Sequence, residues 1–94
     1  MTADDSLIAR QYQVSGKVQG VSFRVSAQAA ARQLGLTGWV CNLPGGRVET
    51  VAYGPRAAIE QFEQWLRRGP RYAAVTAVTS TDCAAPSSVE FVIR

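Results

Sequence analysis

Residues 16–24 combine two glycines with an arginine in a way that suits the binding of an anion. The stretch reads Gly-Lys-Val-Gln-Gly-Val-Ser-Phe-Arg. Gly16 and Gly20 free the backbone to curl, and the amides that open the helix expected next have no intrahelical acceptors. Arg24 adds a permanent cation with a planar donor fork that matches two phosphate oxygens. A cation in the first turn of a helix is unfavourable unless an anion joins it. A phosphate-binding loop is therefore favoured over the alternative, a plain turn followed by a solvated arginine.

A second candidate is Asn42, which ends an apolar segment just before a Leu-Pro-Gly-Gly turn. A helix over residues 22–34 runs roughly 18 Å at ~1.5 Å per residue, and the extended segment 36–42 runs back about 20 Å at ~3.3 Å per residue. Asn42 thus returns to the level of Arg24. Its amide can donate to and accept from a water, as the positioning of a nucleophile requires. Taken alone, Asn42 would rather be interpreted as a turn residue that ends a strand.

The rest of the inventory limits the chemistry. The chain has no histidine and two cysteines, Cys41 and Cys83. Two cysteines without histidine cannot complete a four-ligand zinc site, and no histidine is present to act as a general base or to activate Cys41 as a nucleophile. We expect no metal, no cofactor and reduced cysteines. Positioning and electrostatic stabilisation are then the means of catalysis that remain to the chain.

Charge and hydropathy argue against a nucleic-acid or membrane partner. Ten Lys and Arg residues against seven Asp and Glu give a net charge of +3. The cations are scattered, and we interpret their one cluster, Arg67, Arg68 and Arg71, as a solvated helix end rather than part of a nucleic-acid surface. No apolar run approaches the ~18 residues of a membrane span, and residues 1–11 do not resemble a secretory signal. We expect a cytoplasmic monomer with no nucleic-acid or membrane partner.

The elements that must position these residues follow from periodicity and turn signals. Alternation and short apolar runs predict strands over residues 8–14, 36–42, 47–53, 74–81 and 89–93, and helical spacing predicts helices over 22–34 and from Gly54-Pro55 to about 68. This order is the ferredoxin-like α+β pattern βαββαβ, an antiparallel sheet of four to five strands with two helices on one face. The 94 residues suit a single domain, 1–94, in which residues 1–9 form an N-terminal extension.

Both chemical segments resemble the signature motifs of the acylphosphatase family. The first motif, G-x-V-Q-G-V-x-F-R, matches residues 16–24. The second, G-[aromatic]-V-x-N-x-x-x-G-x-V with a later glycine, is matched by Gly38, Trp39, Val40, Asn42, Gly46, Val48 and Gly54. The resemblance extends from about Arg10 to Arg94.

This resemblance implies a metal-free hydrolase that converts acyl phosphates into a carboxylate and inorganic phosphate. Asn42 would orient the attacking water, and Arg24 would bind the phosphoryl group together with the loop amides of Gln19, Gly20, Val21, Ser22, Phe23 and Arg24. The family often has Arg, Lys or Gln where this chain has Cys41, so a charge that tunes substrate affinity is missing. Trp39 is expected to pack rather than to serve as a substrate platform.

Two other classes of protein share features with this sequence. RNA-recognition modules have the same element order, but they carry a Gly-Phe-Gly-Phe-like run that is absent here. A non-catalytic domain that binds phosphate or an acyl phosphate would keep the phosphate loop without turnover, but it would not need a water-positioning amide at Asn42. The sequence leaves open which acyl phosphate is the natural substrate.

Overall fold

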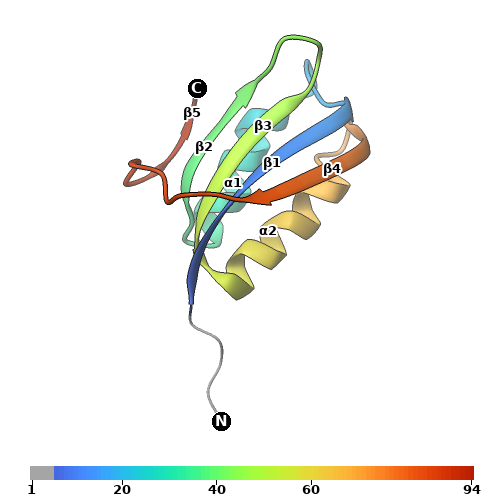
Figure 1. Ribbon diagram of the computed structural model, residues 1–94. Helices are drawn as coiled ribbons and strands as arrows, with labels where there is room; N and C mark the ends of the chain where they lie inside the picture. Colours follow the sequence, from blue (N-terminus) through green and yellow to red (C-terminus); the bar gives the residue numbers. More distant parts are fainter. Residues whose placement is uncertain (1–5) are drawn as a thin grey trace.

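The computed structural model describes residues 6–94. Residues 1–5 lie outside this range. They include the first part of the expected N-terminal extension and of residues 1–11, which were predicted not to be a secretory signal. The chain forms β1 (Leu7–Lys17), α1 (Phe23–Gln33), β2 (Thr37–Asn42), β3 (Val48–Pro55), α2 (Arg56–Arg68), β4 (Ala74–Asp82) and β5 (Phe91–Ile93). Both helices cover the same face of one sheet, and the other face is open (Figure 1). No helix within residues 6–94 is long and apolar enough to cross a membrane.

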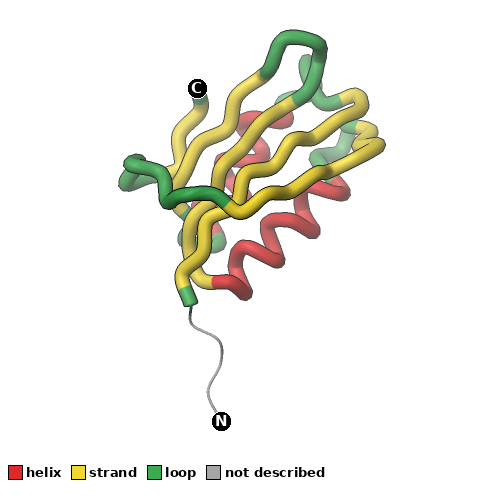
Figure 2. Tube along the Cα trace, in the orientation of Figure 1, coloured by secondary structure: helices red, strands yellow, loops and turns green. Residues whose placement is uncertain are grey.

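The strand order in the sheet is β4-β1-β3-β2-β5. β1 runs antiparallel to β3 and β4, and β2 runs antiparallel to β3. The ferredoxin-like α+β fold class is therefore confirmed. β5 pairs in parallel with β2, which makes the sheet mixed rather than wholly antiparallel. To reach that far edge, the chain after β4 crosses the open face of the sheet (Figure 2).

The core lies between the sheet and the helices because alternate residues of the central strands face the helices. α2 buries one stripe of side chains, since Ile59, Phe62 and Leu66 are each 0% exposed. The aromatic rings of the core meet edge to face around Phe62, which contacts both Tyr12 and Phe91 in this way. Phe23 of α1 also meets Trp65 of α2 edge to face. This packing holds both helices against the sheet.

Several element boundaries differ slightly from the prediction. α1 begins at Phe23, because Ser22 takes the left-handed conformation with φ 62° and precedes the helix as its N-cap. Leu34, where the predicted helix ends, is the C-cap, and Gly35 follows it with φ 73°. Pro55 precedes α2 instead of lying in its first turn. β5 has three residues, two fewer than the predicted segment.

β1 continues past its predicted end because it contains an irregularity. The register between β1 and β4 shifts between Ser15 and Gly16, where Gly16 has φ 120°. A Cβ at Gly16 would collide with the carbonyl oxygen of Ala74. Only glycine allows this close approach of the two strands, and the strand then ends at Lys17, directly before the loop that leads to α1.

Candidate active site

The N-terminus of α1 and the end of β2 meet at a small pocket with a volume of about 130 Å³. Arg24 and Asn42, the two residues predicted to do the chemistry, both line it. The complete lining is Val18, Gln19, Gly20, Ser22, Phe23, Arg24, Val25 and Asn42. Of the predicted loop residues, Val21 alone is absent from this lining, and it packs against the core instead. Val18 and Val25 were not predicted as site residues, and nothing in the pattern around Val25 distinguishes it from a solvated helix residue.

The loop that precedes α1 adopts conformations that leave backbone donors free. Gly20 has φ 76° and no atom lies within 4 Å of its would-be Cβ, so backbone conformation rather than space favours glycine there. Ser22 makes no side-chain capping bond, and the first helical hydrogen bond in this turn is donated by Ser26 to the Ser22 carbonyl. The amides of residues 23–25 therefore have no acceptor within the helix. A helix start of this kind suits an anion.

Arg24 is held from the C-terminal end of the chain. Its Nη1 donates to the backbone carbonyl oxygen of Arg94 at 3.4 Å. Arg94 is fixed in turn, because its backbone N–H donates to the carbonyl of Val40 at 2.8 Å and its guanidinium lies 4.4 Å from the ring centre of Trp39. Within residues 6–94 no side-chain carboxylate pairs with Arg24. Its charge is thus available to an anion in the pocket. Trp39 packs against a cation on the open face, in line with the expected packing role.

Asn42 is the last residue of β2, where it pairs with Val48 of β3. Among the described residues its side chain has no hydrogen-bond partner, and the residue is exposed. The amide can therefore bind a water in the pocket through both its oxygen and its NH₂ group. The predicted return of Asn42 to the level of Arg24 is confirmed by the pocket that they share.

Cys41 lies next to Asn42 in the chain but does not line the pocket. Successive strand residues face opposite sides of a sheet, so Cys41 faces the open side. Burial and the neighbouring Glu49 raise the pKa of the Cys41 thiol, and Arg94 and Arg24 oppose this only partly. A thiol in this environment is neutral near pH 7, which argues against a nucleophilic role. Both Cys41 and Cys83 are free.

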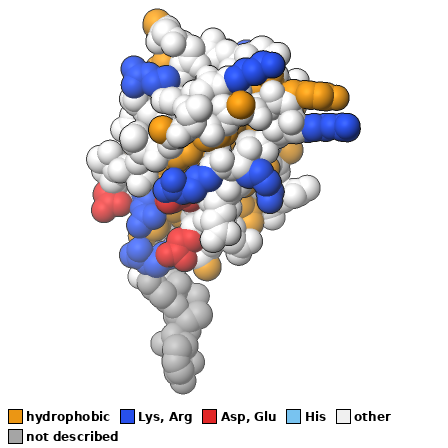
Figure 3. All heavy atoms as spheres, turned by 90° about the vertical axis from the view of Figure 1, so that its right-hand side faces the viewer, with side chains coloured by type: hydrophobic (Ala, Val, Ile, Leu, Met, Phe, Trp, Pro, Cys, Tyr) orange, Lys and Arg blue, Asp and Glu red, His pale blue; other side chains and the backbone are white. Residues whose placement is uncertain are grey.

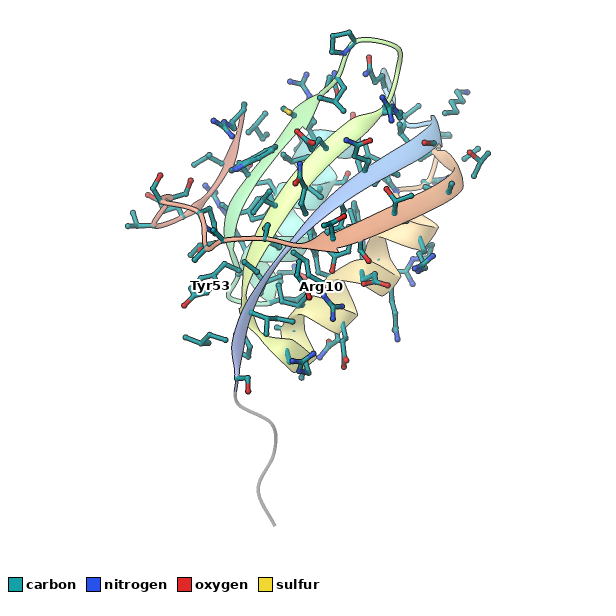
Figure 4. The ribbon with its side chains drawn as sticks, viewed as in Figure 1. Arg10 and Tyr53 are labelled. Carbon is teal, nitrogen blue, oxygen red and sulfur yellow. The ribbon has the colours of Figure 1, made fainter. Side chains whose placement is uncertain are left out.

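A second, larger pocket of about 370 Å³ lies at the other end of the sheet. Figure 4 shows two of its residues, Arg10 and Tyr53, far from the turn that joins β2 and β3. None of the predicted site residues lines it. Arg10 is already paired, with Asp82 at 3.4 Å and with Glu63 at 3.5 Å. The small pocket therefore remains the candidate active site.

The remaining charged groups form no competing centre in the described part of the chain. Residues 6–94 contain no cluster of three or more His, Cys, Asp or Glu side chains. On the face in Figure 3, basic side chains are dispersed, with acidic ones among some of them. In the cluster at the end of α2, Arg67 donates to Glu63 at 3.0 Å, one helical turn away, and Arg71 lies over the Tyr72 ring at 5.5 Å. These contacts are those of a helix end rather than of a second anion site.

Comparison with known proteins places these features in a family. The family model described as Acylphosphatase matches residues 10–93. A relative named acylphosphatase from Azoarcus sp. (strain BH72) is 43% identical over 88 residues, which are 94% of this chain and 90% of the relative. The structure of an acylphosphatase from Coxiella burnetii superimposes with a TM-score of 0.90 at 43% identity and covers 94% of this chain and 93% of its own. The crystal structure of acylphosphatase from Bacillus subtilis gives a TM-score of 0.89 at 34% identity, with coverages of 95% and 99%.

The agreement involves every described helix and strand and the segments that form the pocket. The match begins at Arg10 in β1 and ends at Ile93 in β5, so it includes both the loop before α1 and the end of β2. The family model and these relatives show that the chain belongs to the acylphosphatase family, enzymes that hydrolyse acyl phosphates.

Proposed function

We propose that the pocket binds the phosphoryl group of an acyl phosphate and directs a water onto its phosphorus. Arg24 and the loop amides of residues 19–24 hold the phosphoryl oxygens, and the side chain of Asn42 orients the water. The observation that carries this proposal is the presence of Arg24 and Asn42 in one pocket. One cationic side chain and free backbone amides would alone be enough to bind phosphate. An unpartnered side-chain amide beside them is what the orientation of a nucleophilic water requires.

The size of the pocket supports a small reacting group. Sites that enclose drug-sized ligands usually have volumes of roughly 300–1,000 Å³, and this pocket has about 130 Å³. The phosphoryl group would fill it and leave the acyl part of the substrate at the mouth. The exposed side chain of Val25, 61% accessible, lies on that rim.

The proposed step needs no strong base. The water oxygen forms a bond to phosphorus while the bond between phosphorus and the acyl oxygen breaks, and the electron pair of that bond leaves with the carboxylate. The proton of the water passes to a phosphoryl oxygen of the substrate. Because a carboxylate is a good leaving group and the transition state is loose, catalysis depends on alignment and on stabilising charge on the phosphoryl oxygens. This fits a pocket whose lining contains Arg24 and Asn42 but no histidine.

The test is hydrolysis of an aromatic acyl phosphate in excess chelator, together with competitive inhibition by inorganic phosphate. Arg24→Ala removes one preorganised donor and is expected to lower kcat/KM about 10²- to 10³-fold and to weaken phosphate inhibition. Asn42→Ala is expected to lower kcat and to leave phosphate inhibition within about threefold of the original.

Arg32→Ala is the matched control for Arg24→Ala. Arg32 lies in the last turn of the same helix and makes an exposed ion pair with Glu90 at 3.6 Å, so its removal should leave turnover unchanged. If the original protein binds phosphate but shows no turnover, the pocket serves a non-catalytic binding domain. If Asn42→Ala abolishes phosphate binding in a folded protein, the role assigned to Asn42 is wrong.

We further propose that the chain acts as a single-domain monomer in the cytoplasm, without a metal or cofactor. The composition supports the metal-free part of this proposal, because the chain has no histidine and the chemistry above requires no Lewis acid. Turnover that survives chelation, together with a sedimentation coefficient for a 10.1 kDa particle, would agree with the proposal. Loss of activity in chelator with recovery on addition of a divalent cation would contradict it.

A further inference from the structure

The side chain of Gln19 links the phosphate loop to the turn between β2 and β3. Its Nε2 donates to the backbone carbonyl oxygen of Leu43 and to that of Arg47, both at 2.9 Å. These two bonds use both hydrogens of the amide group. They connect segments that are 24 and 28 residues apart in the sequence, and no other described side chain bridges the two segments.

The two acceptors of Gln19 are the carbonyls that close this turn. The Leu43 N–H donates to the Arg47 carbonyl at 2.8 Å, and the Gly46 N–H donates to the Leu43 carbonyl at 3.3 Å. A carbonyl oxygen has two lone pairs, so each can accept a second bond from Gln19. One side chain therefore connects the closed turn directly to the phosphate loop.

Leu43 directly follows Asn42, and this makes the link relevant to the pocket. Within residues 6–94 the Asn42 side chain has no hydrogen-bond partner of its own, so its position depends on its backbone. That backbone is held on one side by the pairing of Asn42 with Val48 and on the other by the bond from Gln19 to Leu43. Without Gln19, the end of β2 is freer to move relative to the loop that leads to Arg24 in α1.

We propose that Gln19 is a positioning residue, whose side-chain amide fixes the distance between the phosphate loop and the backbone that carries Asn42. This inference rests on the proposed function, because it acts through the water that Asn42 orients. Misplacement of a catalytic group by about 1 Å can cost up to ~10²-fold in rate. Since phosphate binding depends on Arg24 and the loop amides, Gln19 affects turnover more than phosphate affinity.

The first test is Gln19→Met, which keeps the length of the side chain and removes both hydrogen bonds. With an aromatic acyl phosphate as substrate, we expect kcat to fall about tenfold and the inhibition constant of inorganic phosphate to change less than about threefold. Gln11→Met is the control, because Gln11 donates to Glu49 at 2.6 Å from the open face and lies outside the pocket. It should leave kcat unchanged.

A double mutant separates positioning from a general structural role. If Gln19 acts through Asn42, then Gln19→Met in an Asn42→Ala background should change kcat by less than about twofold. A full additional tenfold loss there would overturn the proposal, and so would an unchanged kcat in the single variant. If the original protein shows no turnover at all, the proposed function itself is wrong. That result can be told apart from a failure of the Gln19 proposal, which requires an active original protein.

Gln19→Glu provides a second readout in case Gln19→Met does not fold. An ionised carboxylate has no hydrogen to donate to the two carbonyls, whereas a protonated carboxyl group donates one. The kcat of this variant, relative to the original protein, should therefore rise as the pH falls from about 7 toward about 4.5, near the usual pKa of glutamate. A ratio that is constant over this pH range in a folded variant would contradict the proposal.

Discussion

The two central side chains of the pocket are held in contrasting ways. Arg24 has a fixed partner, the carbonyl of Arg94, at 3.4 Å, whereas Asn42 has no side-chain partner in the described part of the chain. A guanidinium that must bind oxygens in one geometry gains from being held, because less freedom is lost on binding. An amide that must bind a water gains from having its donors and acceptor open. The pocket thus contains a preorganised guanidinium, Arg24, and a side-chain amide, Asn42, without a hydrogen-bond partner among the described residues.

Cys41→Ser tests whether the thiol beside the pocket has any part in the chemistry. Burial and Glu49 raise the pKa of Cys41, and its side chain faces away from the pocket, so we expect kcat to stay within about twofold of the original. Steady-state kinetics of the variant check this. A loss of activity similar to that of Asn42→Ala would show that the thiol takes part.

At the residue scale, the sequence predicted that Arg24 and Asn42 lie close together, as their shared pocket shows, but it did not predict the contacts that support them. Arg24 and Asn42 lie in motifs whose residue types carry their own physical meaning. The contact between Arg24 and Arg94 depends on where the last strand pairs, and the two bonds of Gln19 depend on the approach of two loops. No local periodicity encodes such approaches, so these supports appear only in the folded structure.

At the scale of the elements, the irregularity in β1 lies at Ser15 and Gly16, just before the loop that leads to α1. Gly16→Ala would place a Cβ against the carbonyl oxygen of Ala74 and in a backbone conformation with φ 120°. We expect the free energy of unfolding to fall by about 2–4 kcal/mol, the sum of overpacking and backbone strain. Urea denaturation monitored by tryptophan fluorescence measures this change.

Gly45→Ala is the matched control for Gly16→Ala. Gly45 has φ 92°, but nothing lies within 4 Å of its would-be Cβ. Its replacement should therefore cost only the conformational part, about 1–2 kcal/mol. Equal losses in the two variants would show that the close approach of β1 and β4 is not what requires glycine at position 16.

The predicted elements were correct in type and order, and the errors lie at their ends and in one pairing. Strands β1 to β3 and both helices have strong periodicity, so their assignment needed no tertiary information. β5 has three residues, and long-range bonds hold it in place: Gln28 of α1 donates to the Phe91 carbonyl at 3.0 Å, and Gly38 donates to the Glu90 carbonyl at 3.1 Å. Its parallel pairing with β2 therefore could not be derived from local pattern.

At the scale of the whole molecule, one polar cluster connects the sheet to α2 within the apolar layer. Tyr12 of β1 is 0% exposed, and its hydroxyl donates to Oε1 of Glu63 at 3.2 Å. Glu63 also accepts bonds from Arg10 and Arg67. A buried hydroxyl without a partner would be costly, so the cluster specifies how α2 packs on the sheet. It also makes the stability of the molecule sensitive to alkaline pH.

Burial raises the pKa of Tyr12 above its usual value of 10, Glu63 adds to the rise, and Arg10 partly opposes it. The folded state therefore retains this proton at a pH where the unfolded chain releases it. The contribution of Tyr12 to the free energy of unfolding is fully present below about pH 10, and above that pH it is lost by up to ~1.4 kcal/mol per pH unit.

Tyr12→Phe should lower the free energy of unfolding by about 1 kcal/mol at neutral pH and flatten its decline above pH 10. Urea midpoints between about pH 8 and 11 measure both effects, with Tyr72→Phe, at a residue 70% exposed, as the control. An equally steep alkaline decline in Tyr12→Phe would place its origin elsewhere in the molecule.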